Sequence, residues 1–538
     1  MQDESLRHHS VSPASGIAVV AIGVAMPALP VRPRSLRAAL WGGVSLVALA
    51  GLTLPGSAAL ASCIATSQVI SGPSGPVASD GGDITVTTSG AVAGGTSPGV
   101  DVLACPATSI GNAGGITGAV GVVVVSGQSV TLLSNSGVIS GGSTGVQNNG
   151  SIGELSNSGT ISGGAGVAGI LNTSGGSGQA TIGLLTNSGT ISGGGSGVQN
   201  RQAIGMLTNN GTISGQSFAG IGSSGSIGTL TNNGLIVGGQ AGVTNGPTTA
   251  YQIDTLTNFG TIAGGTQGVT NYGVMSTLTN SGTISGVDFY GINNVGTIGS
   301  VTNTGTISGP TAIRSVGLIG PITNSGVISG NIEIDYQDAI INGGSGHVFG
   351  TLAGGGINIA NGNLLFGSGN QALDESITVN GGSGTVTNAG DLRPVSSQDI
   401  FGNFVQTSAG TLDIQISGTS VGEFGNLTIS GDAAIDGELA VDLLGGFTLA
   451  AGDSFDILDF SGLLGDFDSF ALDGISCTSG GTDRWDCSNL GSGLYFAESI
   501  GADQLDLEVR TNAPEPETLA ILAVGLAGLG MARRRRPG

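Results

Sequence analysis

Short apolar segments alternate with polar residues along most of the chain, and none of the repeated segments has the spacing of an amphipathic helix. A phrase of the form Leu-Ser/Thr-Asn-x-Gly-Thr/Val-Ile-Ser-Gly recurs at intervals of 21 to 30 residues, which is typical of a solenoid. Most copies also contain a Gly-Val/Ile-x-Asn segment and an Ile-Gly pair, so each repeat is predicted to hold three strands. The asparagines of the phrase are Asn135, Asn157, Asn187, Asn209, Asn232, Asn258, Asn280, Asn303 and Asn324.

Three short strands per repeat, rich in Val, Ile, Leu and Thr, predict a parallel β-helix. Neighbouring residues along a strand point to opposite sides. If Leu185 and Ile191 face inward, Asn187 also faces inward, whereas Thr190 faces outward. The asparagines are therefore expected at an interior corner, as a structural ladder in which each amide bonds the coils above and below. No coil is expected to fold alone, because stability has to come from stacking.

Changes in the repeat divide the chain into segments. An N-terminal cap with the first coils is expected over 62–130, the regular repeats over 131–330 and degenerate coils over 331–395. From about Ser396 the period ends and alternating strands predict a separate acidic, β-rich capping domain over 396–513. The predicted fold class is all-β: a parallel β-helix solenoid of short Gly/Asn-rich coils, a C-terminal β-rich domain and a single C-terminal transmembrane helix.

Composition and charge exclude some classes of function. The chain contains 104 glycines, but 39% of its residues are hydrophobic, so the glycines are expected to be turns in an ordered fold and not a sign of disorder. It has no lysine and a formal net charge of −22. Binding of nucleic acid is not expected, because it needs clusters of lysine and arginine that neutralise phosphates.

The N-terminal segment 1–61 is predicted to be an extension followed by a secretory signal. An apolar stretch follows three arginines and ends in small residues, so cleavage is expected after Ala61, with translation beginning at Met26. Residues 60–63 also resemble a lipobox, the sequence that directs lipidation of a cysteine. Lipidation of Cys63 is therefore an alternative.

The tail 514–538 combines a Pro-Glu-Pro motif, an uncharged apolar run from Thr518 to Ala532 and an arginine cluster. An apolar run that ends in arginines can anchor a translocated chain in the inner membrane. This order resembles the PEP-CTERM family of exported bacterial proteins, whose tails are substrates of the membrane protease exosortase. The resemblance implies a transmembrane helix and processing near the motif in a Gram-negative bacterium. Its residues are Pro514, Glu515 and Pro516 as the sorting motif and Arg533, Arg534, Arg535 and Arg536 as the membrane stop.

Residues 451–458 resemble the segment that closes the passenger β-helix of many autotransporters and related PEP-CTERM proteins. An autotransporter ends in a barrel with an aromatic terminus, whereas this chain ends in arginines followed by Pro537 and Gly538. A general export route followed by exosortase-type processing is therefore expected.

The four cysteines are consistent with an oxidising compartment. Cys477 and Cys487 are expected to close a short loop around Trp485, and Cys63 is expected to pair with Cys105 at the N-terminal edge of the β-helix. A metal site is not expected, because the spacings contain no Cys-x-x-Cys element.

No catalytic residue, cofactor or metal site is predicted. Asp288, Tyr290 and Arg314 interrupt the neutral coils and are a candidate site, although isolated polar residues on a solenoid are more often only solvated. An acidic set without an EF-hand pattern is more often a solvated face than a calcium site. Its members are Asp453, Asp456, Asp459, Asp466, Asp468 and Asp473.

The sequence thus predicts an exported, non-catalytic structural or adhesin-like protein that is first anchored in the inner membrane and then lies at the cell surface or in the extracellular matrix. Its expected partners are an exosortase-type protease and extracellular polysaccharide or other surface proteins. Two alternatives remain, a β-helix enzyme that acts on polysaccharide and an ice-binding protein. The outward column considered for ice binding is Thr190, Thr212, Thr261, Thr283 and Thr306.

Overall fold

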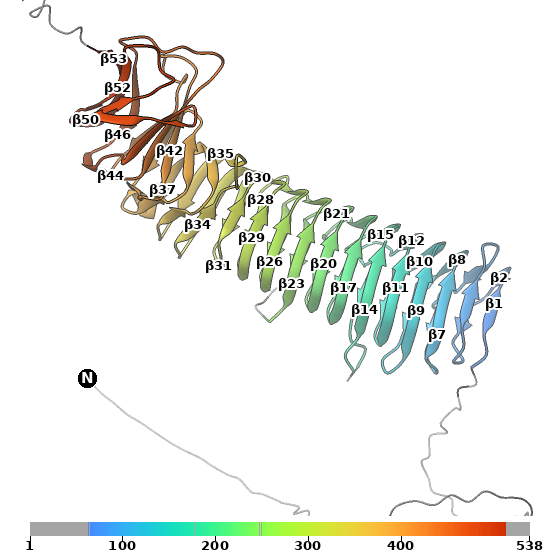
Figure 1. Cartoon of the computed structure of the whole chain (residues 1–538). Helices are drawn as coiled ribbons and strands as arrows, with labels where there is room; N and C mark the ends of the chain where they lie inside the picture. Colours follow the sequence, from blue (N-terminus) through green and yellow to red (C-terminus); the bar gives the residue numbers. More distant parts are fainter. Residues whose placement is uncertain (1–62, 64, 177, 247, 249, 513–538) are drawn as a thin grey trace, which may run out of the picture. The chain divides into compact units, whose positions relative to one another are not determined.

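Short parallel strands stack into a solenoid of about 16 turns in the computed structural model of the protein (Figure 1). The structure describes residues 63, 65–176, 178–246, 248 and 250–512. Within them, one 3-10 helix, η1 (Asn380–Gly382), is the only helical element. The predicted all-β parallel β-helix is therefore confirmed for this part of the chain.

Each regular turn contributes one strand to each of three faces, as the repeat pattern predicted. The first face is a continuous parallel sheet in which each strand pairs with the equivalent strand of the next turn. Its strands up to the end of the regular repeats are β1 (Gln68–Ile70), β4 (Ile84–Val86), β7 (Ala107–Asn112), β9 (Ser129–Asn135), β11 (Ser151–Asn157), β14 (Thr181–Asn187), β17 (Ala203–Asn209), β20 (Ser226–Asn232), β23 (Gln252–Asn258), β26 (Val274–Asn280), β29 (Thr297–Asn303), β31 (Leu318–Ile319) and β32 (Ile322–Asn324).

The second and third faces follow in each turn. The second face contains β2 (Pro73–Ser74), β5 (Ala91–Ala93), β12 (Thr160–Ser162), β15 (Thr190–Gly193), β18 (Thr212–Gly215), β21 (Leu235–Gly238), β24 (Thr261–Gly264) and β27 (Thr283–Gly286). The third face contains β3 (Val77–Ala78), β6 (Val100–Val102), β13 (Ile170–Asn172), β16 (Val198–Asn200), β19 (Ala219–Ser223), β22 (Ala241–Asn245), β25 (Gln267–Asn271) and β28 (Tyr290–Asn294). In other turns one long strand covers both faces, as in β8 (Gly115–Val124), β10 (Val138–Asn148), β30 (Thr306–Ser315), β33 (Val327–Ile334), β35 (Phe349–Ile359) and β37 (Asn370–Val379).

Equivalent residues of successive turns lie in register, so identical side chains stack. Leu155 pairs with Leu185, and both are fully buried. At the corner between the first and second faces the chain turns so tightly that a Cβ on Gly189 would lie 2.1 Å from the carbonyl oxygen of Gly159. This corner therefore requires glycine in every repeat, which explains the invariant glycine of the repeat phrase.

The parallel coils continue well beyond Ser396, the residue at which the sequence predicts the start of a capping domain. The later strands pair in parallel with the coils before them because they keep inward aliphatic or aromatic side chains, such as Leu412, Leu439 and Phe470, after the asparagine phrase is lost. These strands are β34 (Ala339–Asn342), β36 (Leu364–Phe366), β38 (Thr385–Asn388), β39 (Asp391–Pro394), β40 (Ser397–Phe401), β41 (Asn403–Gln406), β42 (Thr411–Ile416), β43 (Asn426–Ile429), β44 (Asp432–Ile435), β45 (Glu438–Leu443), β47 (Gly462–Gly465) and β48 (Ser469–Leu472).

Antiparallel strands close the C-terminal end of the solenoid (Figure 1). Phe470 of the last parallel coil packs against Trp485 and Phe496 of this cap, with ring centroids 5.9 and 5.1 Å apart. The cap therefore covers the end of the apolar core. β46 (Ser454–Asp459) joins the coils to this cap, because it pairs in parallel with β43 and antiparallel with β53. The other strands of the cap are β49 (Ile475–Ser476), β50 (Thr478–Gly481), β51 (Arg484–Asp486), β52 (Leu494–Ile500) and β53 (Gln504–Thr511).

No helix of the described part is long and apolar enough to cross a membrane. The predicted transmembrane helix in the tail, the signal segment 1–61, the start at Met26 and the cleavage after Ala61 lie outside the described residues.

Candidate functional site

The asparagines of the repeat phrase form a buried ladder inside the solenoid. The Nδ2 of Asn157 donates to the Oδ1 of Asn187 in the next turn (2.7 Å) and to the carbonyl oxygen of Thr190 (3.1 Å). The same bonds run from Asn112 to Asn324. Because these amides are buried and bonded to their neighbours, they stabilise the stack and are inaccessible to a ligand.

A second ladder runs along the third face, and the sequence analysis did not assign it. Asn148 donates to Asn172 (2.8 Å), which donates to Asn200 (2.8 Å), and a further run begins with Asn245 and Asn271 (2.7 Å). Serine replaces asparagine at two of its positions. The signal was the Gly-Val/Ile-x-Asn segment, in which the asparagine stands two residues after an inward aliphatic residue and so also points inward.

A disulfide joins Cys63 to Cys105 at the N-terminal edge, with Cα atoms 5.8 Å apart. Lipidation at a lipobox modifies the same sulfur atom of the cysteine. The disulfide and the lipidation of Cys63 therefore exclude each other, and the structure contains the disulfide.

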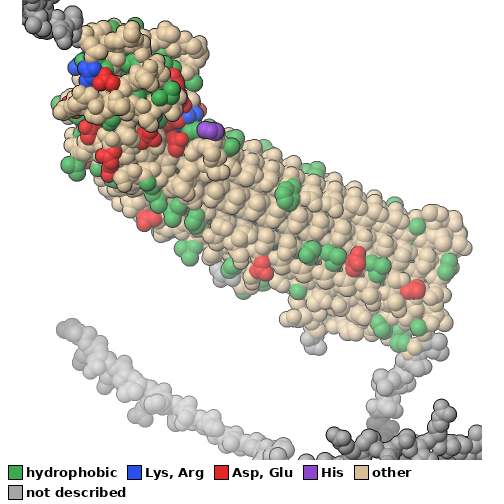
Figure 2. All heavy atoms as spheres, viewed as in Figure 1, with side chains coloured by type: hydrophobic (Ala, Val, Ile, Leu, Met, Phe, Trp, Pro, Cys, Tyr) green, Lys and Arg blue, Asp and Glu red, His purple; other side chains and the backbone are tan. Residues whose placement is uncertain are grey.

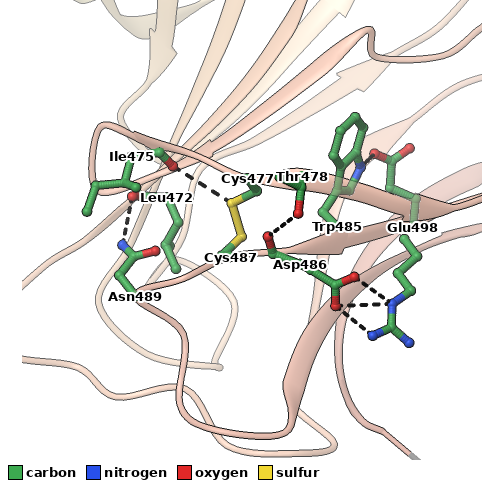
Figure 3. The surroundings of a disulfide bond; sticks show 10 residues. Leu472, Ile475, Cys477, Thr478, Trp485, Asp486, Cys487, Asn489 and Glu498 are labelled. Carbon is green, nitrogen blue, oxygen red and sulfur yellow. Dashed lines mark hydrogen bonds and ion pairs between the residues drawn. A yellow bond between two sulfur atoms is a disulfide. The ribbon is translucent and has the colours of Figure 1, made fainter.

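The second disulfide joins Cys477 and Cys487, with Cα atoms 4.4 Å apart, and fixes one edge of the cap (Figure 3). Beside it, Trp485 donates from Nε1 to Glu498, and Asn489 donates to the carbonyl oxygen of Leu472 (2.8 Å). The Asn489 contact ties the connection between β51 and β52 to the last parallel coil, whereas the Trp485 contact joins those two strands of the cap.

Several buried carboxyl groups in the C-terminal coils and cap have raised pKa values. Burial, with the nearby Asp374 carboxylate, raises the pKa of Glu375 to about 8, and that side chain is 2% exposed. Burial, assisted by Asp466, raises the pKa of Glu498 to about 8 although Trp485 donates to it. Such groups are uncharged near neutral pH because a buried carboxylate is poorly solvated.

Arg393 lies at the centre of a second acidic group. Its guanidinium binds the carboxylates of Asp413 and Asp442, the latter at 3.0 Å, and lies 3.8 Å from the ring centroid of Phe349. Burial and the neighbouring Asp413 raise the pKa of Asp391 to about 7. Arg393 thus forms ion pairs with two carboxylates and belongs to an ion network within the coils.

Three of the six aspartates considered for calcium accept hydrogen bonds from backbone N–H groups. Asp453 accepts from the backbone N–H of Ala450 and Asp473 from that of Leu443, both at 2.8 Å. Asp466 accepts from the N–H of Phe467 (2.8 Å). Within residues 63–512, as far as they are described, no three acidic, histidine or cysteine side chains converge as metal ligands would.

The threonine column considered for ice binding is interrupted. Thr190 pairs with Thr212, but Leu235 lies between Thr212 and Thr261. The first face instead carries two parallel outward rows, Thr229, Thr255 and Thr277 beside Thr231, Thr257 and Thr279. Hydroxyl rows of this kind can hydrogen-bond water or sugars.

Two of the three residues that interrupt the neutral coils lie together. The guanidinium carbon of Arg314 is 5.5 Å from the ring centroid of Tyr290, and its Nη1 donates to Asn293 (3.3 Å). The side chain of Asp288 is exposed, and among the described residues no carboxylate forms a salt bridge with Arg314.

Charged side chains gather over the C-terminal end, whereas the visible face of the regular coils is largely neutral (Figure 2). The regular coils therefore offer hydroxyl and amide groups and few charges to a partner.

Residues 512–536 match the PEP-CTERM protein-sorting motif. The match includes Pro514, Glu515 and Pro516 and the arginines 533–536, as the resemblance implied, and it implies an exported protein. These positions lie outside the described residues except for residue 512. No curated protein matches the sequence.

Proposed function

We propose that this protein is an exported, non-catalytic structural rod that reaches the surface or the extracellular matrix of a Gram-negative bacterium. The observation that carries the proposal is the PEP-CTERM motif at residues 512–536, directly after the capped solenoid. The tail anchors the exported chain in the inner membrane until an exosortase cuts near Pro514 and Pro516.

The form of the rod supports an adhesin-like role. A stack of largely neutral coils, bonded through one continuous asparagine ladder and a second, interrupted one, gives a long and stable surface with many hydroxyl groups. Such a surface suits extracellular polysaccharide or other surface proteins as partners. The two disulfides are consistent with an oxidising location outside the cytoplasm.

The test is mass spectrometry of the terminal peptides of the protein from its host, with the membrane, surface and medium fractions kept apart. We expect a C-terminus near Pro514 in surface or released material. A variant with Pro514→Ala, Glu515→Ala and Pro516→Ala is expected to keep the arginine tail and remain in the membrane fraction. An intact tail on all of the wild-type protein would contradict the proposal.

The non-catalytic part of the proposal has its own test. We expect no new reducing or unsaturated ends when the protein is incubated with neutral and acidic polysaccharides. Release of such ends would favour the enzyme alternative. Thermal hysteresis of the purified protein would favour ice binding.

A further inference from the structure

The third face of the solenoid carries two arginines that form no salt bridge. Of the five arginines among the described residues, Arg393, Arg484 and Arg510 bind carboxylates. Arg201 and Arg314 have no carboxylate partner within the described part. In a chain with a net charge of −22, two such cations on the same face are unexpected.

Strand register places Gln199 and Arg314 in one column of the third face, five turns apart. Arg201 lies two residues after Gln199, just past the end of that strand, so the two arginines lie near opposite ends of the same stretch of the rod. At about 4.8 Å per turn, the column is roughly 24 Å long. The residues between its ends are uncharged: Gly222 and Thr244, which are partly exposed, and Thr270 and Asn293, which are buried.

A groove of about 470 Å³ lies over the first part of this column. Gly222 has no side chain and leaves space in the groove, since a Cβ at this position would have no neighbour closer than 3.8 Å. Phe218 forms one side and is 51% exposed, whereas Tyr272, 36% exposed, and Arg201 belong to the opposite side. Gln199 and Gln240 add amide groups to the lining.

The far end of the column repeats the same combination. Phe289 is 53% exposed beside Tyr290, whose ring lies under the guanidinium of Arg314. Beyond Arg314 the next residue of the column is Glu333, which accepts from Thr311 and marks where the surface becomes acidic. The exposed Asp288 is the other acidic side chain near this end.

We propose that the third face between Arg201 and Arg314 binds an extended carboxylated polysaccharide. The two arginines bind carboxylates of the polymer, since guanidinium groups pair well with planar anions. The exposed rings of Phe218, Tyr272 and Phe289 contact the apolar faces of sugar rings. The amides of Gln199 and Gln240 and the hydroxyl of Thr244, which line the groove, bind sugar hydroxyls. Glu333, the in-register neighbour of Arg314, opposes a polymer carboxylate at that end, whereas salt screens the acidic groups of the C-terminal coils that lie beyond about 8 Å.

This inference rests on the proposed function, in which the rod meets polysaccharide outside the cell. The inference goes further in two respects: it names the face of the solenoid that binds, and it specifies that the polymer is negatively charged. A protein partner fits the observations less well, because the surface is a narrow polar track with only isolated aromatic rings.

The test measures binding of the purified full chain to polygalacturonate, with dextran as the uncharged polymer, by isothermal titration calorimetry at low and moderate salt. We expect binding of polygalacturonate alone, weakened by salt. Arg201→Gln combined with Arg314→Gln should weaken it roughly tenfold for each arginine. Arg510→Gln, which removes a salt-bridged arginine of the cap, should leave binding unchanged.

The aromatic and groove contacts have matched variants. Phe218→Ala should weaken binding several-fold, whereas Phe259→Ala, at an equally exposed ring (57%) on another corner, should not. Gly222→Gln should block the groove and leave the fold intact, because a Cβ at this position would meet no atom closer than 3.8 Å. Circular dichroism checks that the fold is unchanged. Equal affinity for dextran, or unchanged binding by the double arginine variant, would overturn the inference. The sorting of the chain, measured from its terminal peptides, tests the proposed function separately. A chain that is sorted as expected but binds no polygalacturonate would contradict only the polysaccharide inference.

Discussion

At the scale of single residues, the solenoid depends on side chains that are both polar and buried. Each ladder asparagine donates to the next asparagine and to a backbone carbonyl, so one side chain links consecutive turns. An unpaired buried amide or carbonyl would cost free energy that no solvent contact could offset. The interior therefore fixes the register of successive turns through these hydrogen bonds, in addition to burying apolar side chains.

Replacing one ladder residue should therefore destabilise the rod. Asn187→Ala removes one acceptor of the Asn157 Nδ2 and the amide that donates to the Oδ1 of Asn209 and the carbonyl oxygen of Thr212. We expect a loss of about 2 to 3 kcal/mol in the free energy of unfolding. Urea denaturation followed by circular dichroism measures it. Asn233→Ala is the control, because Asn233 bonds Asn210 on the exposed surface and should change stability by less than about 0.5 kcal/mol. Equal effects would refute the structural role of the ladder.

Buried carboxyl groups predict an unusual dependence of stability on pH. Glu375 and Glu498 have pKa values of about 8 in the folded chain, whereas an unfolded glutamate titrates near about 4.3. Between these values the folded state binds more protons than the unfolded state, so stability is greatest at the acidic end and is lost as the pH rises.

We expect the thermal unfolding midpoint to fall between about pH 5 and pH 8.5, as measured by differential scanning calorimetry. In a variant with Glu375→Gln and Glu498→Gln the fall should be smaller, since the amides do not ionise. Two results would contradict the raised pKa values of Glu375 and Glu498: a midpoint that rises over this pH range, or a variant whose midpoint depends on pH as strongly as that of wild type.

At the scale of elements, the repeats predicted the three strands of each turn and their inward residues, because alternation along a strand depends only on local sequence. The continuation of the coils past Ser396 was missed because later turns keep inward aliphatic residues but lose the asparagine phrase. The third-face groove was also missed. Its parts come from separate turns joined by loops of unequal length, so only the observed register brings Gln199, Gly222 and Thr244 into one column.

The cap offers an element-scale prediction. Its disulfide closes a short loop, and Cys477→Ser combined with Cys487→Ser should destabilise the cap by about 3 kcal/mol. Hydrogen exchange is expected to increase over β49 to β53 and to remain unchanged in the regular coils, because each coil contacts mainly its neighbours. Uniformly faster exchange along the whole rod would show instead that the cap and the coils unfold together.

At the scale of the whole molecule, the equivalent bonding of successive turns makes the rod modular. Deleting residues 210–232 joins Asn209 to Asn233 and removes β18, β19 and β20, which form one complete turn. Asn209 then occupies the ladder position of Asn232 and can donate to Asn258, as Asn232 does at 2.8 Å. Every inward residue on either side keeps its direction, so we expect a folded rod that is one turn, about 4.8 Å, shorter.

The control deletion removes residues 210–220, about half of a turn, and joins Asn209 to Ile221 of the third face. It eliminates a second-face strand, so the chain cannot close that turn without breaking the register of its neighbours. Limited proteolysis and urea denaturation of both variants distinguish the cases. The full-turn deletion should resist protease nearly as well as wild type, whereas the half-turn deletion should be cut near the junction. Removal of a full turn leaves the ladder bonds equivalent to those of wild type. If both deletions are cut equally by protease, the turns depend on packing against their individual neighbours and not on the shared ladder.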